Sequence, residues 1–341
     1  MVQEGGWRIA LVIPAYRVER HIADVLRSVP PWVRHVIVVD DASPDGTLGE
    51  VQRVAASDDR ITILRHERNQ GVGGAMVTGL QKALELGVHI AVKVDGDGQM
   101  DMEDLPRLLA PLITGRADYA KGNRFRDFKA LRRMPPIRRM GNMALSFLAK
   151  AATGYWTCFD PTNGFVAIRS EVLAQVPSEK IHRSYFFEIS MLAQLYLLGA
   201  VVKDVPMPAR YGAEVSSLSI RRVLFEFPPR LVAAFVRRIL LRHFVYDFNM
   251  ASLYLLIGVP MCLVGALFGG YEWWNYAHAG IRAPTGTVMI PTLLVILGFQ
   301  LLLSAAAFDL QSVPSDPLCA GMMPSAQGAQ DGTLQRHASS I

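Results

Sequence analysis

Cysteine is scarce in this chain, which has 341 residues and only three cysteines. Cys158, Cys262 and Cys319 form no CxxC pair, which excludes a disulfide scaffold and a structural zinc domain. The N-terminus also lacks a basic stretch followed by an uninterrupted apolar stretch and a cleavage site. We therefore predict no secretory signal, and a first domain that stays in the cytoplasm.

Charge is scarce as well, because only 19% of the residues are charged and 51% are hydrophobic. This composition excludes a disordered protein and also a purely soluble one. Residues 248–271 and 287–308 contain no charge at all, and each stretch exceeds the ~20 residues that a helix needs to cross a bilayer. We predict a transmembrane helix in each. The alternative, a pair of buried core helices, rarely runs this long without a charge.

Arginines crowd the chain before the first predicted span, whereas the loop between the spans carries only Glu272 and Arg282. The positive-inside rule therefore places residues 1–247 in the cytoplasm. This predicts a multi-pass protein of the cell (inner) membrane with its large domain inside.

The segments on either side of the spans differ in pattern. Residues 216–247 alternate arginine with apolar residues at helical spacing and are interrupted at Pro228 and Pro229, which predicts two amphipathic helices on the membrane surface. The tail, residues 309–341, is rich in Ser, Pro, Gly and Gln without periodicity. We expect it to be disordered.

Residues 1–215 alternate strand and helix signals. Four short runs rich in Ile and Val predict buried parallel strands, at 9–13, 36–39, 61–64 and 90–94. Amphipathic stretches lie between and after them, with apolar faces around Leu80 and Leu108. The expected fold is α/β, a mostly parallel doubly wound sheet flanked by helices, whose ligand crevice lies beyond the carboxyl ends of the strands.

Acidic and glycine-rich segments follow three of these strands where each one ends. They are Asp40 and Asp41, the NQGVGG segment at 69–74, and Asp95, Asp97 and Gln99. Carboxylate and amide oxygens suit Mg²⁺ or Mn²⁺, which commonly bridge to a substrate diphosphate. The glycines allow close backbone approach and open a helix, whose N-terminus favours an anion. An Asp-x-Asp alone is common in solvated turns, but two acidic strand ends in register, with the glycine segment at a third, favour a metal site.

In order and spacing, these motifs resemble the family 2 glycosyltransferases of GT-A fold, and among them the polyprenyl-phosphate glycosyltransferases, the group of dolichyl-phosphate mannosyltransferases and undecaprenyl-phosphate glucosyltransferases. The resemblance runs through VIPAY, VVDDASPDGT, NQGVGGA, DGDGQ, GNRF, DPTNGF and RYGAEVSSL to the paired spans, over about residues 8–310. It implies a GT-A catalytic domain in residues 1–215, a nucleotide-sugar donor, and Mg²⁺ or Mn²⁺ as cofactor.

The resemblance also implies roles for individual residues. Pro14, Tyr16 and Asp41 would contact the nucleotide base, Asp95 would contact the ribose or the metal, and Asp97 and Gln99 would hold the metal; Asp97, Asp160 and Arg124 would be the catalytic set. Asp160 would position the acceptor or act as a weak base, and Arg124 would bind phosphate.

Two departures from the family pattern bear on the substrates. Arg17 and Val18 follow Tyr16 where relatives commonly have Asn-Glu, so the donor can be UDP- or GDP-linked. The Glu-Asp-like pair that activates a sugar hydroxyl is missing, and Glu188 is followed by Ile189 instead. A phosphate acceptor needs less help, because it already carries about −1.5 to −2 charge near neutral pH.

A basic stretch supports an anionic acceptor. Residues 121–139 hold eight basic residues and only one acidic residue, which is typical of an anion-binding loop. We expect Arg126, Arg138 and Arg139 to bind the acceptor phosphate. The predicted membrane anchor argues against nucleic acid as the partner, whereas attachment to anionic lipid headgroups remains an alternative.

The sequence thus predicts a membrane-anchored, metal-dependent, inverting enzyme that moves one sugar from a nucleotide onto a polyprenyl phosphate, and that forms a homo-oligomer. Two alternatives stay open. In the first, the acceptor is a saccharide or lipid-linked glycan, and Glu188 is the essential base. In the second, the chain is a non-catalytic membrane subunit that binds nucleotide sugar.

Overall fold

The computed structural model describes residues 6–124, 136–160, 163–208 and 220–321. It divides the chain into two compact units, one made of Met1–Ala234 with Pro314–Ile341 and the other of Phe235–Val313.

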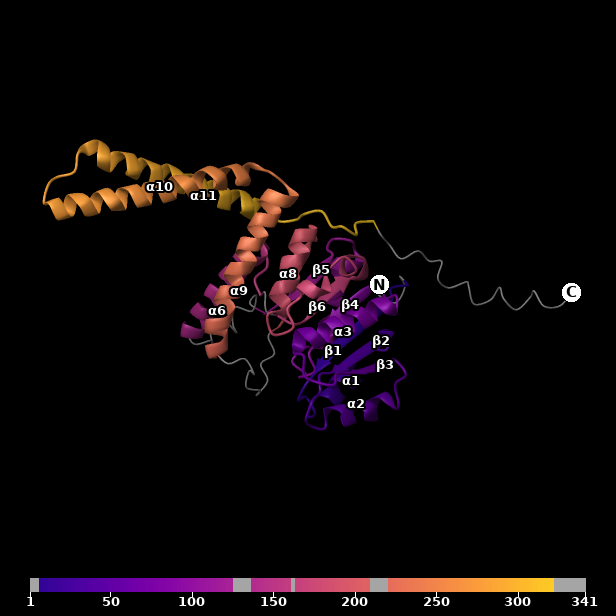
Figure 1. The fold of residues 1–341 in the computed structure, drawn as a ribbon. Coiled ribbons are helices and arrows are strands. Elements are labelled where there is room, and N and C mark those ends of the chain that lie inside the picture. The colour runs from indigo at the N-terminus through magenta and orange to yellow at the C-terminus, as the bar shows by residue number, and fades with distance from the viewer. Residues whose placement is uncertain (1–5, 125–135, 161–162, 209–219, 322–341) are drawn as a thin grey trace. The chain divides into compact units, whose positions relative to one another are not determined.

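The first unit is built on a seven-stranded sheet with the order β3-β2-β1-β4-β6-β5-β7 (Figure 1). Its strands are β1 (Ile9–Ala15), β2 (His35–Asp40), β3 (Ile61–Arg65), β4 (Ile90–Lys93), β5 (Tyr119–Asn123), β6 (Val166–Arg169) and β7 (Val202–Pro206). Only β6 runs antiparallel to its neighbours β4 and β5. The mostly parallel sheet and the four predicted strands are therefore confirmed.

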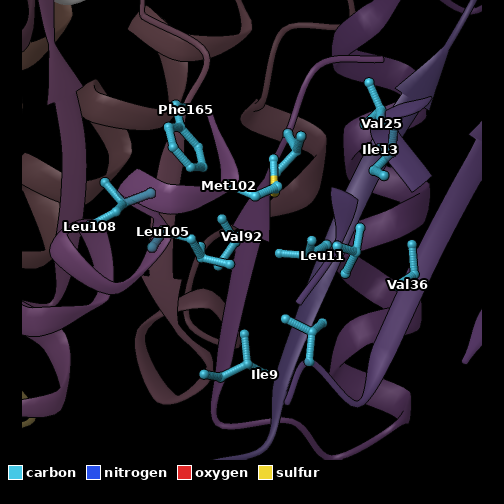
Figure 2. Packing of buried hydrophobic residues seen from close by; sticks show 14 of the residues in the cluster. Ile9, Leu11, Ile13, Val25, Val36, Val92, Met102, Leu105, Leu108 and Phe165 are labelled. Carbon is cyan, nitrogen blue, oxygen red and sulfur yellow. The ribbon is translucent and has the colours of Figure 1, made fainter. Parts of the chain in front are cut away.

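Helices pack on both faces of this sheet. They are α1 (Ile22–Ser28), α2 (Thr47–Ala55), α3 (Val72–Glu85), α4 (Leu105–Ile113), α6 (Pro136–Thr153), α7 (Ser170–Leu173) and α8 (Phe187–Leu198), with short 3₁₀ turns at Met102–Asp104 and Ser178–Lys180. Side chains alternate along a strand, so Ile9, Leu11 and Ile13 of β1 belong to the same core cluster as Leu105 and Leu108 of α4, and Ile13 lies beside Val25 of α1 (Figure 2). The residues between them face α3, where a Cβ on Gly79 would overlap Val12.

The prolines of the basic segment do not divide it. One helix, α9 (Ile220–Leu240), runs through Pro228 and Pro229, where the sequence predicts a break between two helices. Phe227 and Leu231, on either side of the prolines, are buried in a cluster with residues of α6 and α8. This packing outweighs the local loss of backbone hydrogen bonds that prolines cause.

The second unit contains two long apolar helices, α10 (Met250–Ala279) and α11 (Thr285–Gln311), which lie side by side (Figure 1). Only 22% and 17% of their most apolar windows are buried inside the protein, so they are candidate membrane spans rather than core helices of a soluble protein. Glycines allow the helices to approach closely, because a Cβ on Gly298 would lie 2.9 Å from the backbone nitrogen of Cys262.

A buried ionic cluster joins the ends of this unit. Arg238 of α9 donates to both carboxylate oxygens of Asp309 of α11, at 2.6 and 2.9 Å. His243, in a π-helical turn at Leu241–Tyr246, lies 3.3 Å from the same carboxylate. All three side chains are buried, so the hydrogen bonds between them offset part of the cost of burying their polar groups. His243 also lies 3.2 Å from the side-chain oxygen of Asn249 through its other ring nitrogen.

After α11 the chain returns to the first unit. The backbone N–H groups of Leu318 and Cys319 donate to the carboxylate of Asp118 at 2.9 and 3.0 Å. Val201 donates to it at 2.8 Å. The predicted disorder of residues 309–341 is thus corrected in two places. Residues 309–311 are the end of α11, and residues 314–321 are held by hydrogen bonds to a buried carboxylate, which leave no periodic signal in a sequence. Residues 322–341 lie outside the described residues.

Candidate functional site

The carboxyl ends of β1, β2 and β4 bring the predicted donor-side residues to one edge of the sheet. Pro14 lies at the end of β1, and Tyr16 follows it with 41% of its surface exposed. Gly96 lies against this segment, since a Cβ added to it would come within 3.6 Å of the Pro14 carbonyl oxygen. The loop after β4 therefore packs directly on the loop after β1, as the sheet topology predicts.

Asp41 is buried and fixes the glycine segment that follows β3. Its carboxylate accepts hydrogen bonds from the backbone N–H groups of Gln70 and Gly71, both at 2.8 Å. The Nδ1 atom of His66 lies 2.7 Å from the same carboxylate. Its neighbour Asp40 is equally buried, and burial raises the pKa of the Asp40 carboxyl. Asp41 thus holds the glycine segment in place. Its predicted contact with the nucleotide base stays a prediction.

The glycines open α3 as expected, and Gly71 caps the helix with φ of 85°. The backbone that approaches them, however, belongs to the chain itself. Gly74 donates its N–H to the carbonyl oxygen of Arg183 at 3.1 Å, and a Cβ on Gly73 would overlap the carbonyl oxygen of His182. The segment before α8 is therefore docked onto the glycine loop.

Asp95, Asp97 and Gln99 lie on the short loop after β4. The Gln99 N–H donates to the Asp97 carboxylate at 3.0 Å, which tightens the turn. Both aspartates are partly exposed and Gln99 is exposed. Within the described residues, no group of three or more His, Cys, Asp or Glu side chains is placed to hold a metal. Two carboxylates and one amide nevertheless fit Mg²⁺ or Mn²⁺ that takes its remaining oxygens from a diphosphate.

Lys93 is a member of this site that the sequence analysis missed. Its ammonium lies 2.6 Å from Asp95 Oδ1 and 3.3 Å from Glu188 Oε1, and its side chain is 2% exposed. Burial alone would lower the pKa of Lys93, but the two carboxylates outweigh it and raise that pKa. The signal was a lysine inside an otherwise apolar strand, two residues before Asp95 and hence on the same face.

Arg124, which follows β5, forms an ion pair with Asp160. Arg124 Nε donates to Asp160 Oδ2 at 2.9 Å. The Asp160 side chain has no exposed surface, whereas the Arg124 side chain is 40% exposed. The buried carboxylate therefore fixes the orientation of the guanidinium. Phosphate binding by Arg124, and the role of Asp160 in positioning the acceptor or acting as a weak base, stay predictions.

Asp204 of β7 is a second residue that the sequence analysis missed. It accepts hydrogen bonds from Asn123 Nδ2 at 2.8 Å and from the Phe159 N–H at 2.7 Å. The Cys158 thiol donates to it at 3.2 Å, and burial raises the pKa of both the thiol and the Asp204 carboxyl. Asp204 therefore ties the strand before Arg124 to the loop that carries Asp160.

The predicted acceptor-binding arginines are not placed. Arg126 lies outside the described residues, and Arg138 and Arg139 belong to α6, but their side chains also lie outside them. Further along α6, Met143 and Phe147 are 65% and 60% exposed, which leaves an apolar face uncovered.

Comparisons with known proteins show which family the sequence resembles. Residues 10–176 match the family described as glycosyl transferase family 2. The chain is 34% identical over 186 residues to a UDP-N-acetylglucosamine–dolichyl-phosphate N-acetylglucosaminyltransferase of Methanococcus voltae, which covers 51% of this chain and 73% of the relative. It is 32% identical over 203 residues to an undecaprenyl-phosphate mannosyltransferase of Micrococcus luteus, which covers 59% of this chain and 82% of the relative.

A solved structure shares the fold. It is glucosyl-3-phosphoglycerate synthase from Mycobacterium tuberculosis, crystallised with Mn²⁺, UDP and glucosyl-3-phosphoglycerate, with a TM-score of 0.53 and 20% identity. The match covers 70% of this chain and 82% of that one.

Proposed function

The chain belongs to glycosyl transferase family 2, and from this membership we propose that it transfers one sugar from a UDP- or GDP-linked donor to a polyprenyl phosphate at the cytoplasmic face of a membrane. One observation carries the proposal. Two relatives that are 34% and 32% identical to this chain over the aligned residues are both named for polyprenyl-phosphate acceptors. The two candidate spans and the exposed apolar face of α6 supply the membrane contact that such an acceptor requires.

The donor lies at the rim formed by the loops after β1, β2 and β4. Pro14, Tyr16 and Asp41 border the nucleotide base, while Asp95, Asp97 and Gln99 would hold Mg²⁺ or Mn²⁺. A cation held there would supply positive charge that stabilises the leaving diphosphate. Because these residues sit on loops fixed by buried strands, the donor is oriented before the acceptor arrives.

The reaction is a single displacement that inverts the anomeric carbon. An oxygen of the lipid phosphate attacks C1 of the sugar and forms the new C1–O bond, while the bond from C1 to the diphosphate breaks. Arg124, oriented by Asp160, stabilises phosphate charge during this exchange. Arg126, Arg138 and Arg139 draw the lipid phosphate to the site.

The ion pair of Glu188 argues against a glycan acceptor. A general base needs a carboxylate that can accept the acceptor's proton, but Glu188 is buried and lies 3.3 Å from the Lys93 ammonium. A phosphate acceptor requires no such base.

The test is a transfer assay with the purified full-length protein in detergent. Undecaprenyl phosphate, Mg²⁺ or Mn²⁺, and a panel of radiolabelled UDP- and GDP-sugars are incubated, and the label that moves into the organic phase is counted. We expect label that depends on both metal and lipid. Water-soluble or glycan-linked product would contradict the acceptor assignment.

Asp97→Ala tests the metal assignment in the same assay, with the exposed Asp59→Ala as the matched control. We expect at least a ~100-fold loss for Asp97→Ala and little change for Asp59→Ala. Near-normal turnover of Asp97→Ala would rule out the metal role.

A further inference from the structure

Lys93 lies where three separate segments of the chain meet. Its ammonium is 2.6 Å from Asp95 Oδ1 on the loop after β4, 3.3 Å from Glu188 Oε1 in the first turn of α8, and 3.4 Å from the carbonyl oxygen of Gly164. Gly164 follows the loop that carries Asp160. Residues of the donor side and the acceptor side thus share one buried cation.

The chemistry of an ammonium makes this arrangement specific. Lysine has three N–H donors and no acceptor, and Lys93 faces three oxygens. A buried charge without partners is strongly unfavourable, so the ammonium holds all three groups in place. Because Asp95 Oδ1 accepts a hydrogen bond from the buried Lys93 ammonium, this contact fixes the orientation of the whole Asp95 carboxylate.

Gly164 provides independent evidence that the backbone lies close against this cluster. A Cβ at this position would overlap both Lys93 Nζ and Asp95 Oδ2. The backbone at 164 therefore lies directly on the ion pair, and even a methyl group would push the Asp95 carboxylate away from its position. The glycine of the DPTNGF segment is thus explained by the metal side of the site.

We propose that Lys93 is a positioning residue, which with Gly164 holds the Asp95 carboxylate in the orientation that binds the cation and nucleotide, and which keeps Glu188 as a counter-ion rather than a base. This inference rests on the proposed function for the identity of the ligand. It adds a link between the two sides of the site that neither motif reveals on its own.

The experiment compares binding with stability in the full-length protein. Lys93→Met, Lys93→Arg, Gly164→Ala, Glu188→Gln and the double variant Lys93→Met/Glu188→Gln are titrated calorimetrically with UDP and with GDP in the presence of Mn²⁺, and the apparent Tm of each is recorded. Lys82→Met is the matched control, because Lys82 forms a surface ion pair with Glu85 on α3.

If Lys93 is a positioning residue, the variants should change the apparent Tm and the nucleotide affinity independently of each other. Lys93→Met lowers both the apparent Tm and the nucleotide affinity, the latter at least tenfold. Removing Glu188's charge in the double variant restores the Tm but leaves the affinity low. Lys93→Arg binds nucleotide more tightly than Lys93→Met but less tightly than the wild type. Gly164→Ala weakens nucleotide binding at least tenfold. Lys82→Met binds nucleotide as the wild type does. Recovery of affinity together with Tm in the double variant would reduce Lys93 to a structural role and overturn the proposal.

Glu188→Gln separates the counter-ion role from a base role. As a counter-ion, it changes turnover in parallel with nucleotide affinity. A loss of kcat of a hundredfold or more with unchanged affinity would identify Glu188 as the base and contradict the inference. Since the titrations contain no lipid, a failure to find transfer to polyprenyl phosphate would refute the proposed function while these comparisons still decide the role of Lys93.

Discussion

At the scale of single residues, the glycine loop after β3 is a position where another part of the backbone approaches closely. Its glycines were expected to let a ligand approach the backbone, and they do leave room for close approach. The room next to Gly71 and Gly73 is filled by the carbonyl oxygens of Arg183 and His182. The motif therefore joins the donor rim to the segment that leads into Glu188.

This packing predicts opposite effects for two glycine-to-alanine changes. Gly73→Ala should lower the free energy of unfolding by about 1–3 kcal/mol, because its methyl group would overlap a backbone carbonyl. Gly49→Ala, in the exposed part of α2 with nothing near its Cβ position, should raise it by about 0.5–1 kcal/mol through helix propensity. Denaturant unfolding of both variants in detergent measures the difference. Equal effects would show that residues 182–183 are not held against the loop.

The site residues differ in how visible they are in the sequence. Asp95 and Asp97 stand in a recognisable motif, and the Arg124–Asp160 pair connects two further motifs, GNRF and DPTNGF, whose contact the sequence analysis did not predict. Lys93 and Asp204 stand in no motif, because their roles depend on which strands become neighbours. A charged residue within a buried strand was the available signal. It indicates that the charged side chain has a partner, but it does not identify that partner.

At the scale of elements, the same limit applies. The runs of Ile and Val that form β1 to β4 are visible because strands of a parallel sheet are rich in such residues, and the run in β4 stays visible although it includes Lys93. β5 (YAKGN) and β7 (VKDVP) have no such run, and β6 (VAIR) has only three apolar residues before Arg169. Nothing local indicates that β6 inserts antiparallel between β4 and β5, since that order depends on long-range packing.

The contact between α9 and α11 makes a prediction at this scale. Asp309→Ala should lower the free energy of unfolding by about 3–5 kcal/mol, because it leaves the guanidinium of Arg238 buried without its counter-ion. The apparent Tm in detergent measures the loss.

Two further variants make this prediction specific. Asp59→Ala is the control, because Asp59 is exposed, and it should change stability by less than about 0.5 kcal/mol. Replacing both partners with apolar residues, Arg238→Met with Asp309→Leu, should recover most of the loss. An Asp309→Ala protein as stable as the wild type would show that the pair contributes nothing.

At the scale of the whole molecule, the apolar surface of α10 and α11 is exposed to a degree that water does not favour, because less than a quarter of each apolar window is buried in the protein. A lipid or detergent surround replaces the missing protein contacts. The sheet domain, in contrast, has its own hydrophobic core. Stability measurements therefore require lipid or detergent, so that apolar chains solvate the helical hairpin formed by α10 and α11. Under that condition they report on the folding of the sheet domain.

Ligand binding should stabilise the whole protein. At a nucleotide concentration about 100 times its Kd, mass action adds about 2.7 kcal/mol to the folded state, which raises the apparent Tm by roughly 5–10 °C for a domain of this size. UDP or GDP with Mn²⁺ should produce this shift in a thermal unfolding experiment, and EDTA should abolish it. A shift that persists in EDTA, or in Asp97→Ala, would contradict metal-bridged donor binding.

The hydrogen bonds of Asp118 link positions about 200 residues apart, because its carboxylate binds the backbone of Leu318 and Cys319. A chain is synthesised from its N-terminus at about 5–20 residues per second, so this carboxylate waits many seconds for its last two donors. Both candidate spans are made during that delay. The sheet domain thus forms its last hydrogen bonds only after α10 and α11 have been synthesised. Formation of the hydrogen bonds to Asp118 is therefore a sign that both spans have been made.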